Sequence, residues 1–277
     1  METLLSSDQH PIRYLDMGRG QAVIFLHGWT SGAREWLPFA TELSDRHRTL
    51  CWDARGHGRH TPPPLEQMHI KRLADDLEQL LNHHRIQDAV LVGHSMGALI
   101  SWEYIRHYGL ERLAGLCIVD QSPKLLTDTD WPLGVYGDFD HARNQAFLRR
   151  LDEDFAEGVL ELAANGLNLR SRDNYAQNSR GFQQMREYLG QLHAPALTRC
   201  WDSLTQQDYR DILPLIDRPT LMIYGDSSQF YNREVPEWVE AALPCPELHV
   251  YRQADHSPHL WHKEQFARHL RHWIGKL

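Results

Sequence analysis

Residues 89–98 of this 277-residue chain read AVLVGHSMGA. An apolar, β-branched run leads into Gly93, Ser95 and Gly97, which form a G-x-S-x-G pattern, and a helix-compatible run over 98–108 follows. A serine on a sharp strand-to-helix turn has a strained backbone, and side chains two residues away on either side would clash, so glycine is needed there. Such a turn lifts the serine hydroxyl off the sheet and aims the first N–H groups of the helix at the atom it attacks. The pattern predicts Ser95 as a nucleophile; the alternative is a glycine-rich turn that only packs.

Length and composition indicate a globular protein with one large domain or two small ones. The chain is 42% hydrophobic and 24% charged, which is ordinary for a soluble protein. No run reaches the roughly 18 apolar residues that a membrane span requires, and residues 1–10 lack the features of a secretory signal. Cys51 and Cys117 lie within expected core strands, and the chain has no C-x-x-C pair. We therefore expect buried reduced thiols, no membrane association and a cytoplasmic location.

Charge and histidine content argue against two other classes of protein. A net charge of -8 argues against a nucleic-acid partner, because phosphate binding needs clustered Lys and Arg. The chain has 18 histidines, some at helical spacing, such as His259 with His262 and His269 with His272. A metal site needs three or four converging ligands with acidic or thiolate support, and most of these histidines lie on charged stretches. We expect neither a metal nor another cofactor.

Strand-like and helix-like stretches alternate along most of the chain. The expected strands are residues 12–16, 22–26, 49–52, 89–92, 113–119, 220–224 and 248–251. The expected helices are residues 33–43, 65–84, 98–108, 234–242 and 260–274. This alternation implies a mostly parallel sheet covered on both faces. Residues 124–212 are instead helix-rich, aromatic and polar, and such an insertion would cover the carboxyl ends of the strands, where ligands bind in open α/β sheets.

The order and intervals of five motifs resemble the α/β-hydrolase superfamily over nearly the whole chain outside the insertion. These motifs lie at residues 27–29, 53–58, 93–97, 218–220 and 255–256. The resemblance implies an α/β-hydrolase fold with a core of residues 1–123 and 213–277 and a helical cap of residues 124–212.

The resemblance also supplies partners for Ser95. A free hydroxyl is a poor nucleophile and needs a base. His256 occupies the loop after the last expected strand, where the family's catalytic histidine lies; the alternative is a surface histidine. The family's oxyanion donors correspond to the backbone N–H groups of Trp29 and Met96, although Trp29 could simply pack. His94 is expected to point into the sheet without a catalytic role.

The acid of the triad has two candidates. The superfamily usually carries it as the last residue of a Gly-x-x-Asp pattern, but residues 225–228 end in Ser228, and Asp226 comes two residues early. The stretch around Asp120, Val-Asp-Gln-Ser-Pro, resembles a subgroup whose acid follows the strand before the cap. The two strand ends are neighbours in this fold, so either carboxylate can reach His256. We favour Asp120 and keep Asp226 as the alternative; the other would be a turn or helix-capping aspartate.

These features favour a serine hydrolase that cleaves an ester, lactone or thioester of a small-molecule acyl substrate through an acyl-enzyme on Ser95. The family's epoxide hydrolases and haloalkane dehalogenases need a carboxylate at this position, so serine argues against both. Carbon–carbon bond hydrolases and haloperoxidase-like members keep serine. So do acyl or aminoacyl transferases and biosynthetic thioesterases, whose acyl donor would be bound to a carrier protein or a coenzyme.

The remaining alternative is a non-catalytic member that binds a small ligand. An intact set of serine, histidine and acid argues against it. The aromatic content of residues 124–212 favours an apolar or aromatic acyl group. The sequence assigns no oligomeric state.

Overall fold

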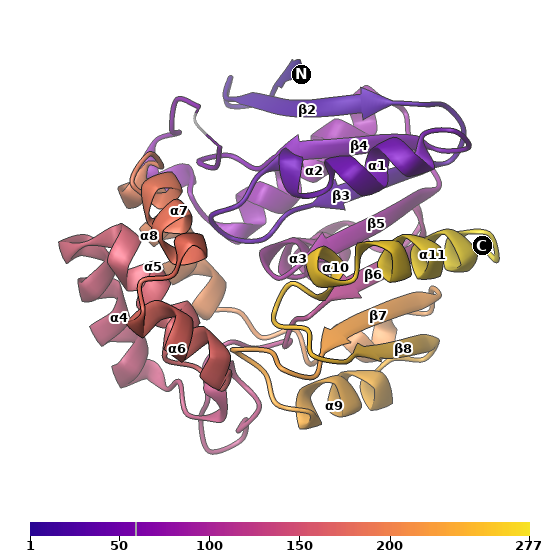
Figure 1. Cartoon of the computed structure of the whole chain (residues 1–277). Helices are drawn as coiled ribbons and strands as arrows, with labels where there is room; N and C mark the ends of the chain where they lie inside the picture. Colours follow the sequence, from indigo (N-terminus) through magenta and orange to yellow (C-terminus); the bar gives the residue numbers. More distant parts are fainter. Residues whose placement is uncertain (59) are drawn as a thin grey trace.

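The computed structural model describes residues 1–58 and 60–277, in which eight strands form one sheet. The strands are β1 (Glu2–Leu5), β2 (Pro11–Met17), β3 (Ala22–Leu26), β4 (Arg48–Asp53), β5 (Ala89–His94), β6 (Leu113–Val119), β7 (Thr220–Gly225) and β8 (Pro246–Tyr251). Their order across the sheet is β1-β2-β4-β3-β5-β6-β7-β8 (Figure 1). The pairs β1–β2 and β2–β4 are antiparallel and all other pairs are parallel, which confirms the predicted mostly parallel sheet. Strand β1 was not among the expected strands.

Helices cover both faces of the sheet (Figure 1). One face carries α1 (Leu37–Leu43) and α11 (Lys263–Ile274), with α10 (Pro258–Trp261) beside α11, and the other carries α2 (Ile70–His83), α3 (Met96–Tyr108) and α9 (Glu234–Ala242). Successive side chains of a strand point to opposite faces. In β3, Val23 and Phe25 accordingly pack with α1 and α11, whereas Ile24 and Leu26 pack with α2 and α3. The continuous apolar run over 22–26 thus follows from burial on both faces.

Three expected helices are each interrupted. Residues 33–43 divide into a short 3₁₀ turn, η1 (Ala33–Glu35), and α1; residues 65–84 divide into η2 (Leu65–Gln67) and α2; and the last helix divides into α10 and α11. The start of α2 has a local cause, because the extended backbone of His69 lets its ring accept a hydrogen bond from Arg72 N at 3.2 Å. Proline occupies the first turn of both α1 and α10, where its missing N–H costs nothing.

A helical insertion separates β6 from β7 and lies beyond the carboxyl ends of the parallel strands (Figure 1). It contains η3 (Val135–Gly137), α4 (His141–Glu153), α5 (Phe155–Ala164), α6 (Leu169–Ala176), α7 (Arg180–Leu189), α8 (Ala194–Thr205) and η4 (Leu213–Leu215). Side chains of Asp140, Asp154 and Asn168 each accept a hydrogen bond from the first turn of the helix that follows, which sets the starts of α4, α5 and α6. Residues 124 and 212 stay predictions as the limits of a separate domain.

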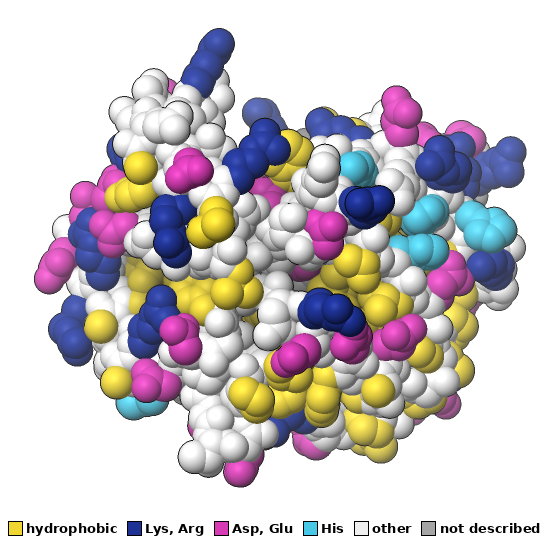
Figure 2. Space-filling model, turned by 60° about the horizontal axis from the view of Figure 1, so that its bottom comes forward, with side chains coloured by type: hydrophobic (Ala, Val, Ile, Leu, Met, Phe, Trp, Pro, Cys, Tyr) yellow, Lys and Arg dark blue, Asp and Glu magenta, His cyan; other side chains and the backbone are white. Residues whose placement is uncertain are grey.

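The surface carries mixed charge. On the face in Figure 2, Lys and Arg side chains alternate with Asp and Glu side chains and do not gather into one basic patch. Several histidine side chains lie close together on the same face (Figure 2). In the fold, the rings of His249 in β8 and His269 in α11 have centroids 4.1 Å apart. Cys51 and Cys117 are buried in β4 and β6, as the sequence predicts. Among the described residues, no helix combines the length and apolar character needed to cross a membrane.

The turn from β5 to α3 has the strained geometry that the sequence predicts. Ser95 has φ 52° and ψ -115°, a conformation that L-residues rarely adopt. A Cβ atom on Gly93 would lie 2.5 Å from the carbonyl carbon and oxygen of Gly97. A Cβ atom on Gly97 would lie 2.1 Å from the carbonyl oxygen of Leu26 in β3. Both contacts involve backbone atoms, so the sheet itself would have to shift to admit a side chain.

Replacing Gly97 by alanine should therefore lower the free energy of unfolding by about 1–3 kcal/mol, the usual cost of overpacking a tight core site. Urea denaturation monitored by tryptophan fluorescence measures the change. A Cβ atom on Gly181 in α7 would have no heavy atom within 4 Å, so Gly181→Ala is the matched control and should be neutral or slightly stabilising. Equal unfolding free energies for the two variants would contradict this packing argument.

Candidate active site

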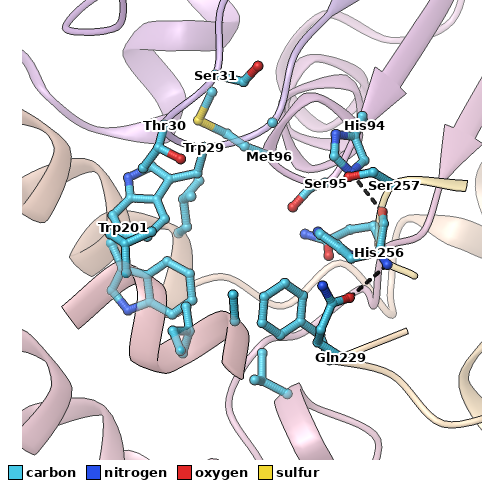
Figure 3. Close-up of a pocket in the computed structure, with 18 of the residues that line it drawn as sticks. Trp29, Thr30, Ser31, His94, Ser95, Met96, Trp201, Gln229, His256 and Ser257 are labelled. Atoms are coloured by element: carbon cyan, nitrogen blue, oxygen red, sulfur yellow. Dashed lines mark hydrogen bonds between the residues drawn. The ribbon is translucent and has the colours of Figure 1, made fainter. Parts of the chain in front are cut away.

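Four loops at the carboxyl ends of the parallel strands meet at one cavity. Gly28 and Trp29 follow β3, Ser95 follows β5, Asp120 follows β6 and His256 follows β8. The cavity encloses about 300 Å³ between these loops and the helical insertion. Figure 3 shows Ser95 and the ring of His256 next to each other at its edge, across from the indole rings of Trp29 and Trp201. Every sequence-predicted candidate except Asp120 and Asp226 lines the cavity directly.

Asp120 lies behind His256 and contacts it. His256 Nδ1 is 2.6 Å from Asp120 Oδ2, and the two side chains are 12% and 0% exposed. Ser228 Oγ donates to the same Oδ2 at 2.8 Å, and Gly225 N donates to Oδ1 at 3.1 Å. A positive φ of 46° at Asp120 turns the chain out of β6 at this point. Asp120 thus accepts three hydrogen bonds, as a buried carboxylate requires.

Asp226 has a different environment. Its side chain is exposed, and its Oδ1 accepts hydrogen bonds from Gln253 N at 2.6 Å and from Ser227 Oγ at 2.9 Å. These contacts tie the loop after β7 to the turn after β8. Of the two candidate acids, the geometry therefore brings Asp120 to His256 and leaves Asp226 in the contacts of a turn residue.

The main chain of His256 is held from two sides. Its N–H donates to Gln229 Oε1 at 2.8 Å, and its carbonyl oxygen is 2.9 Å from His94 Nε2 (Figure 3). The ring of Phe230 packs edge-on against the imidazole, with centroids 4.5 Å apart. Burial lowers the pKa of His256, and the hydrogen bond from its ring to Asp120 opposes that effect only in part, so the pKa lies below its usual value.

The two predicted oxyanion donors flank Ser95. Met96 is the first residue of α3, so its N–H has no carbonyl one helical turn before it. Trp29 lies outside the helices and strands, and its N–H makes no hydrogen bond within residues 1–58 and 60–277. The Trp29 indole also reaches the insertion: its Nε1 donates to Leu197 O at 2.9 Å, and its ring packs on Trp201 at 4.8 Å. Trp29 thus joins the core to the insertion as well as bordering the cavity.

The sequence predicts that His94 points into the sheet, but the structure places its ring elsewhere. Its ring borders the cavity and forms a buried cluster with Glu35 and His259. Glu35 Oε1 lies 2.8 Å from His94 Nδ1 and 3.1 Å from His259 Nε2. The expectation failed because Glu35, 59 residues away in the chain, gives the ring a polar partner beneath the turn.

The pKa values in this cluster move in opposite directions. Burial alone would raise the pKa of Glu35, but the neighbouring His94 and His259 outweigh it and hold the pKa well below its usual range. Burial alone would lower the pKa of His94, yet Glu35 raises it. Burial lowers the pKa of His259 to about 4. These shifts favour the carboxylate form of Glu35, the protonated form of His94 and the neutral form of His259.

Within the described ranges this cluster is the one group whose ligand atoms are close enough to hold a metal, with all three atoms within 4.8 Å of one another. Two histidines and one carboxylate are a plausible donor set for a divalent transition metal. However, Glu35 Oε1 already accepts hydrogen bonds from both rings. The three atoms that would bind a metal are therefore already paired through protons. Tertiary packing brings His259 to Glu35 and His94, and its helical spacing to His262 plays no part in this cluster.

The wall of the cavity is mainly apolar. Its aliphatic and thioether side chains are contributed by Met96, Leu99, Leu125, Val135, Val159, Leu162, Met185, Leu189, Leu204 and Leu260. Of the aromatic residues in the insertion, Tyr188 and Trp201 line the cavity, whereas others such as Phe139 and Phe147 belong to the core of the insertion. Sequence alone could not sort these two groups.

Three residues around the site were not predicted. Ser228 and Gln229 lie in a Gly-x-x-Ser-Gln stretch whose sequence bears only on where the triad acid lies and predicts no contact for either residue. In the structure Ser228 contacts Asp120, and Gln229 contacts the main chain of His256. Glu35 had no sequence signal, because one glutamate in a helix-like stretch resembles any solvated residue.

Comparison with known proteins agrees with this architecture. The pattern of the alpha/beta hydrolase fold family matches residues 21–263. A non-heme chloroperoxidase from Kitasatospora aureofaciens is 28% identical over 284 residues that cover 100% of both chains. A pimeloyl-(acyl-carrier protein) methyl ester esterase from Vibrio vulnificus is 27% identical over 272 residues, covering 98% of this chain and 100% of its own.

Solved structures show the same fold. An esterase from Exiguobacterium antarcticum superposes with a TM-score of 0.84 at 21% identity and covers 99% of this chain and 98% of its own. A bromoperoxidase from Bacillus anthracis gives a TM-score of 0.82 at 24% identity, covering 99% and 100% of the two chains. Since the family pattern spans most of the sequence, the chain belongs to the alpha/beta hydrolase fold family.

Proposed function

We propose that this protein is a serine hydrolase that cleaves an uncharged carboxylic ester or thioester through an acyl-enzyme on Ser95. The observation that supports this proposal most strongly is the 2.6 Å contact between His256 Nδ1 and Asp120 Oδ2 beside Ser95. A ring that donates Nδ1–H to a carboxylate keeps its Nε2 unprotonated, and Nε2 is then free to take a proton from the serine hydroxyl. Ser95, Asp120 and His256 follow one another along the chain in the Ser, Asp, His order of α/β-hydrolase triads.

The proposed reaction proceeds in two halves. Ser95 Oγ attacks the carbonyl carbon while His256 Nε2 takes the hydroxyl proton, and the N–H groups of Trp29 and Met96 donate to the oxyanion. The carbon–oxygen or carbon–sulfur bond to the leaving group then breaks, and His256 returns the proton to that group. Water attacks the acyl-enzyme with the same base, which releases the acid and restores Ser95. Asp120 stabilises the imidazolium and does not itself take the proton.

The lining of the cavity supports an uncharged substrate. Side chains such as Leu99, Val159 and Leu204 favour an apolar acyl or alkyl group. No lysine or arginine occurs among the described residues that line the cavity, whereas the Glu35 carboxylate does. The histidine cation that borders the cavity, His94, is already paired with Glu35. A free acid would therefore find no unpaired counter-charge among the described residues of the cavity, and the product of hydrolysis would be expelled more readily than an ester.

Turnover of graded p-nitrophenyl esters and acyl thioesters, with wild type and Ser95→Ala side by side, tests the proposal. We expect wild-type activity to peak at one acyl length and kcat to fall by at least about 10³-fold in the variant, with substrate binding nearly unchanged. Similar rates in the two proteins would overturn the proposal. A burst of one equivalent followed by almost no turnover would show that the acyl-enzyme waits for an acceptor other than water, and would favour a transferase. Binding without any turnover would favour a ligand-binding member of the family.

Substitution of the two candidate acids separates their roles. Asp120→Asn should lower kcat by about 10⁴-fold, the loss expected when a triad histidine loses its acid. Asp226→Asn should change kcat by less than about threefold, because its contacts only hold a turn. The same ester assay measures both, and equal or reversed losses would contradict the assignment of Asp120.

A relocated acid provides a second test. Ser228 Oγ lies 2.8 Å from the Asp120 oxygen that contacts His256, so a carboxylate at position 228 should approach the same ring. The double variant Asp120→Asn/Ser228→Asp should regain at least about tenfold in kcat over Asp120→Asn alone. As the control, Asp120→Asn/Ser227→Asp adds the same charge one residue earlier and should regain nothing.

The pH dependence of kcat/KM follows from the environment of His256. The base acts in its neutral form, so activity rises with pH through the pKa of His256, which lies below its usual value. The hydrogen bond from His256 to Asp120 raises this pKa, and its removal should lower it further. The acid limb of the residual activity of Asp120→Asn should therefore lie at lower pH than that of wild type, whereas Asp226→Asn should leave it in place. A limb that moves to higher pH in Asp120→Asn would contradict this electrostatic assignment.

A further inference from the structure

The buried cluster beneath the turn at Ser95 connects three parts of the proposed site. Glu35 Oε2 accepts a hydrogen bond from Gly28 N at 3.4 Å, and Gly28 precedes the oxyanion donor Trp29. Glu35 Oε1 contacts His94 Nδ1, and His94 directly precedes Ser95. The other ring nitrogen of His94, Nε2, contacts the carbonyl oxygen of His256. The cluster thus contacts the oxyanion loop and the main chain of His256, and it includes the residue that directly precedes Ser95.

Hydrogen-bond chemistry fixes the protons in this arrangement. The carbonyl oxygen of His256 can only accept, so His94 Nε2 must carry a hydrogen. The Glu35 carboxylate also accepts, so His94 Nδ1 carries one too, which makes the ring an imidazolium. The charges that face this ring are Glu35 from η1 and, more distantly, Asp120 after β6; both favour the cation, whereas His256 and His259 contribute neutral rings.

We propose that Glu35 and the doubly protonated ring of His94 are positioning residues that hold the oxyanion loop and the His256 loop in register with Ser95. This inference rests on the proposed function. The close packing adds to it: a Cβ atom on Gly28 would lie 3.0 Å from His94 Nδ1 and 3.6 Å from Ser95 Cβ. The loop at Gly28 therefore packs directly against the ring of His94. A shift of either Glu35 or His94 would move the backbone that carries the Trp29 N–H donor.

Several surrounding contacts hold the pair itself. The ring of His259 stacks on Trp36, with centroids 4.5 Å apart and planes at 24°, and presents Nε2 to Glu35. His259 Nδ1 is buried without a partner in the described structure, which fits a neutral ring that donates from Nε2 alone. One buried carboxylate thus accepts hydrogen bonds from a main-chain N–H and from two imidazole rings.

The first test is a double-mutant cycle on kcat for p-nitrophenyl ester hydrolysis, with the variants Glu35→Gln, His94→Gln and both together. A misplacement of about 1 Å in an active site costs about 10²-fold, so each single variant should lose about 10²-fold in kcat with KM changed by less than about threefold. The double variant restores a neutral, hydrogen-bonded pair and should lose no more than either single variant. If the two losses multiply, so that the double variant loses about 10⁴-fold in kcat, the inference is overturned. A wild-type kcat in Glu35→Gln would overturn it as well.

A matched control separates positioning from loss of a buried charge. Glu103 in α3 is also a buried carboxylate, with a side chain 5% exposed, and contacts Tyr209 Oη and His107 Nε2, each at 3.0 Å. It does not line the cavity. Glu103→Gln should be destabilised in urea to an extent comparable with Glu35→Gln but should keep wild-type kcat. If kcat falls in both variants in proportion to the loss in unfolding free energy, Glu35 has no positioning role.

A spectroscopic test does not depend on turnover. In ¹⁵N-labelled wild type at pH 8, His94 should show two protonated ring nitrogens, and in Glu35→Gln the ring should be neutral, because burial then acts without the carboxylate. The His94→Gln spectrum assigns the signals. A neutral His94 in the wild type, or a ring nitrogen bound to co-purified metal, would overturn the inference. If Ser95→Ala equals wild type in the ester assay, the proposed function fails, and the protonation of His94 still decides whether the ion pair exists.

Discussion

The contact between the backbone of Gly97 and the carbonyl group of Leu26 is the constraint on which this molecule depends. Because Gly97 has no side chain, the first turn of α3 packs directly against β3. The chain can then turn from β5 into α3 at Ser95, whose backbone is strained. Because the strain lies at one residue, the packing of β5 and α3 on either side must hold it. Those elements are almost entirely buried, which gives them the rigidity to do so. The same turn presents Ser95 and the first N–H group of α3 on one side.

The parallel order of the strands brings the other groups to this turn. β3, β5, β6, β7 and β8 are neighbours in the sheet and run in the same direction, so their carboxyl ends share one edge. Asp120 leaves β6 with a positive φ, and Ser228 and Gly225 reach it from the end of β7. A carboxylate on either strand could approach His256, since only one inter-strand spacing of about 4.8 Å separates them. In this chain a serine occupies the β7 position and donates to the carboxylate from β6.

Much of this architecture could be predicted from local sequence. The glycines around Ser95, the doubly buried strands and the order of the motifs follow from short-range sterics and from side-chain alternation. The breaks within three helices could not, because they depend on caps and prolines whose effect competes with a continuous apolar pattern. Gln229 and Glu35 were missed for a different reason. Their contacts with His256 and His94 span 27 and 59 residues, and no local pattern reports such a partner.

The charges around Ser95 form a balanced set that helps explain why so many polar groups are buried together. In the proposed site, Asp120 and Glu35 contribute two negative charges and the doubly protonated His94 one positive charge, so the resting site with a neutral His256 carries one net negative charge. In the proposed reaction, protonation of His256 during attack brings this sum to zero, at the moment when the oxyanion forms beside the N–H groups of Trp29 and Met96. The buried His94 ring opposes that protonation through its charge, and Glu35 Oε1, 2.8 Å from His94 Nδ1, offsets part of this effect. Pairing His94 with Glu35 therefore limits how far a histidine that supports the loop of His256 weakens the proposed base.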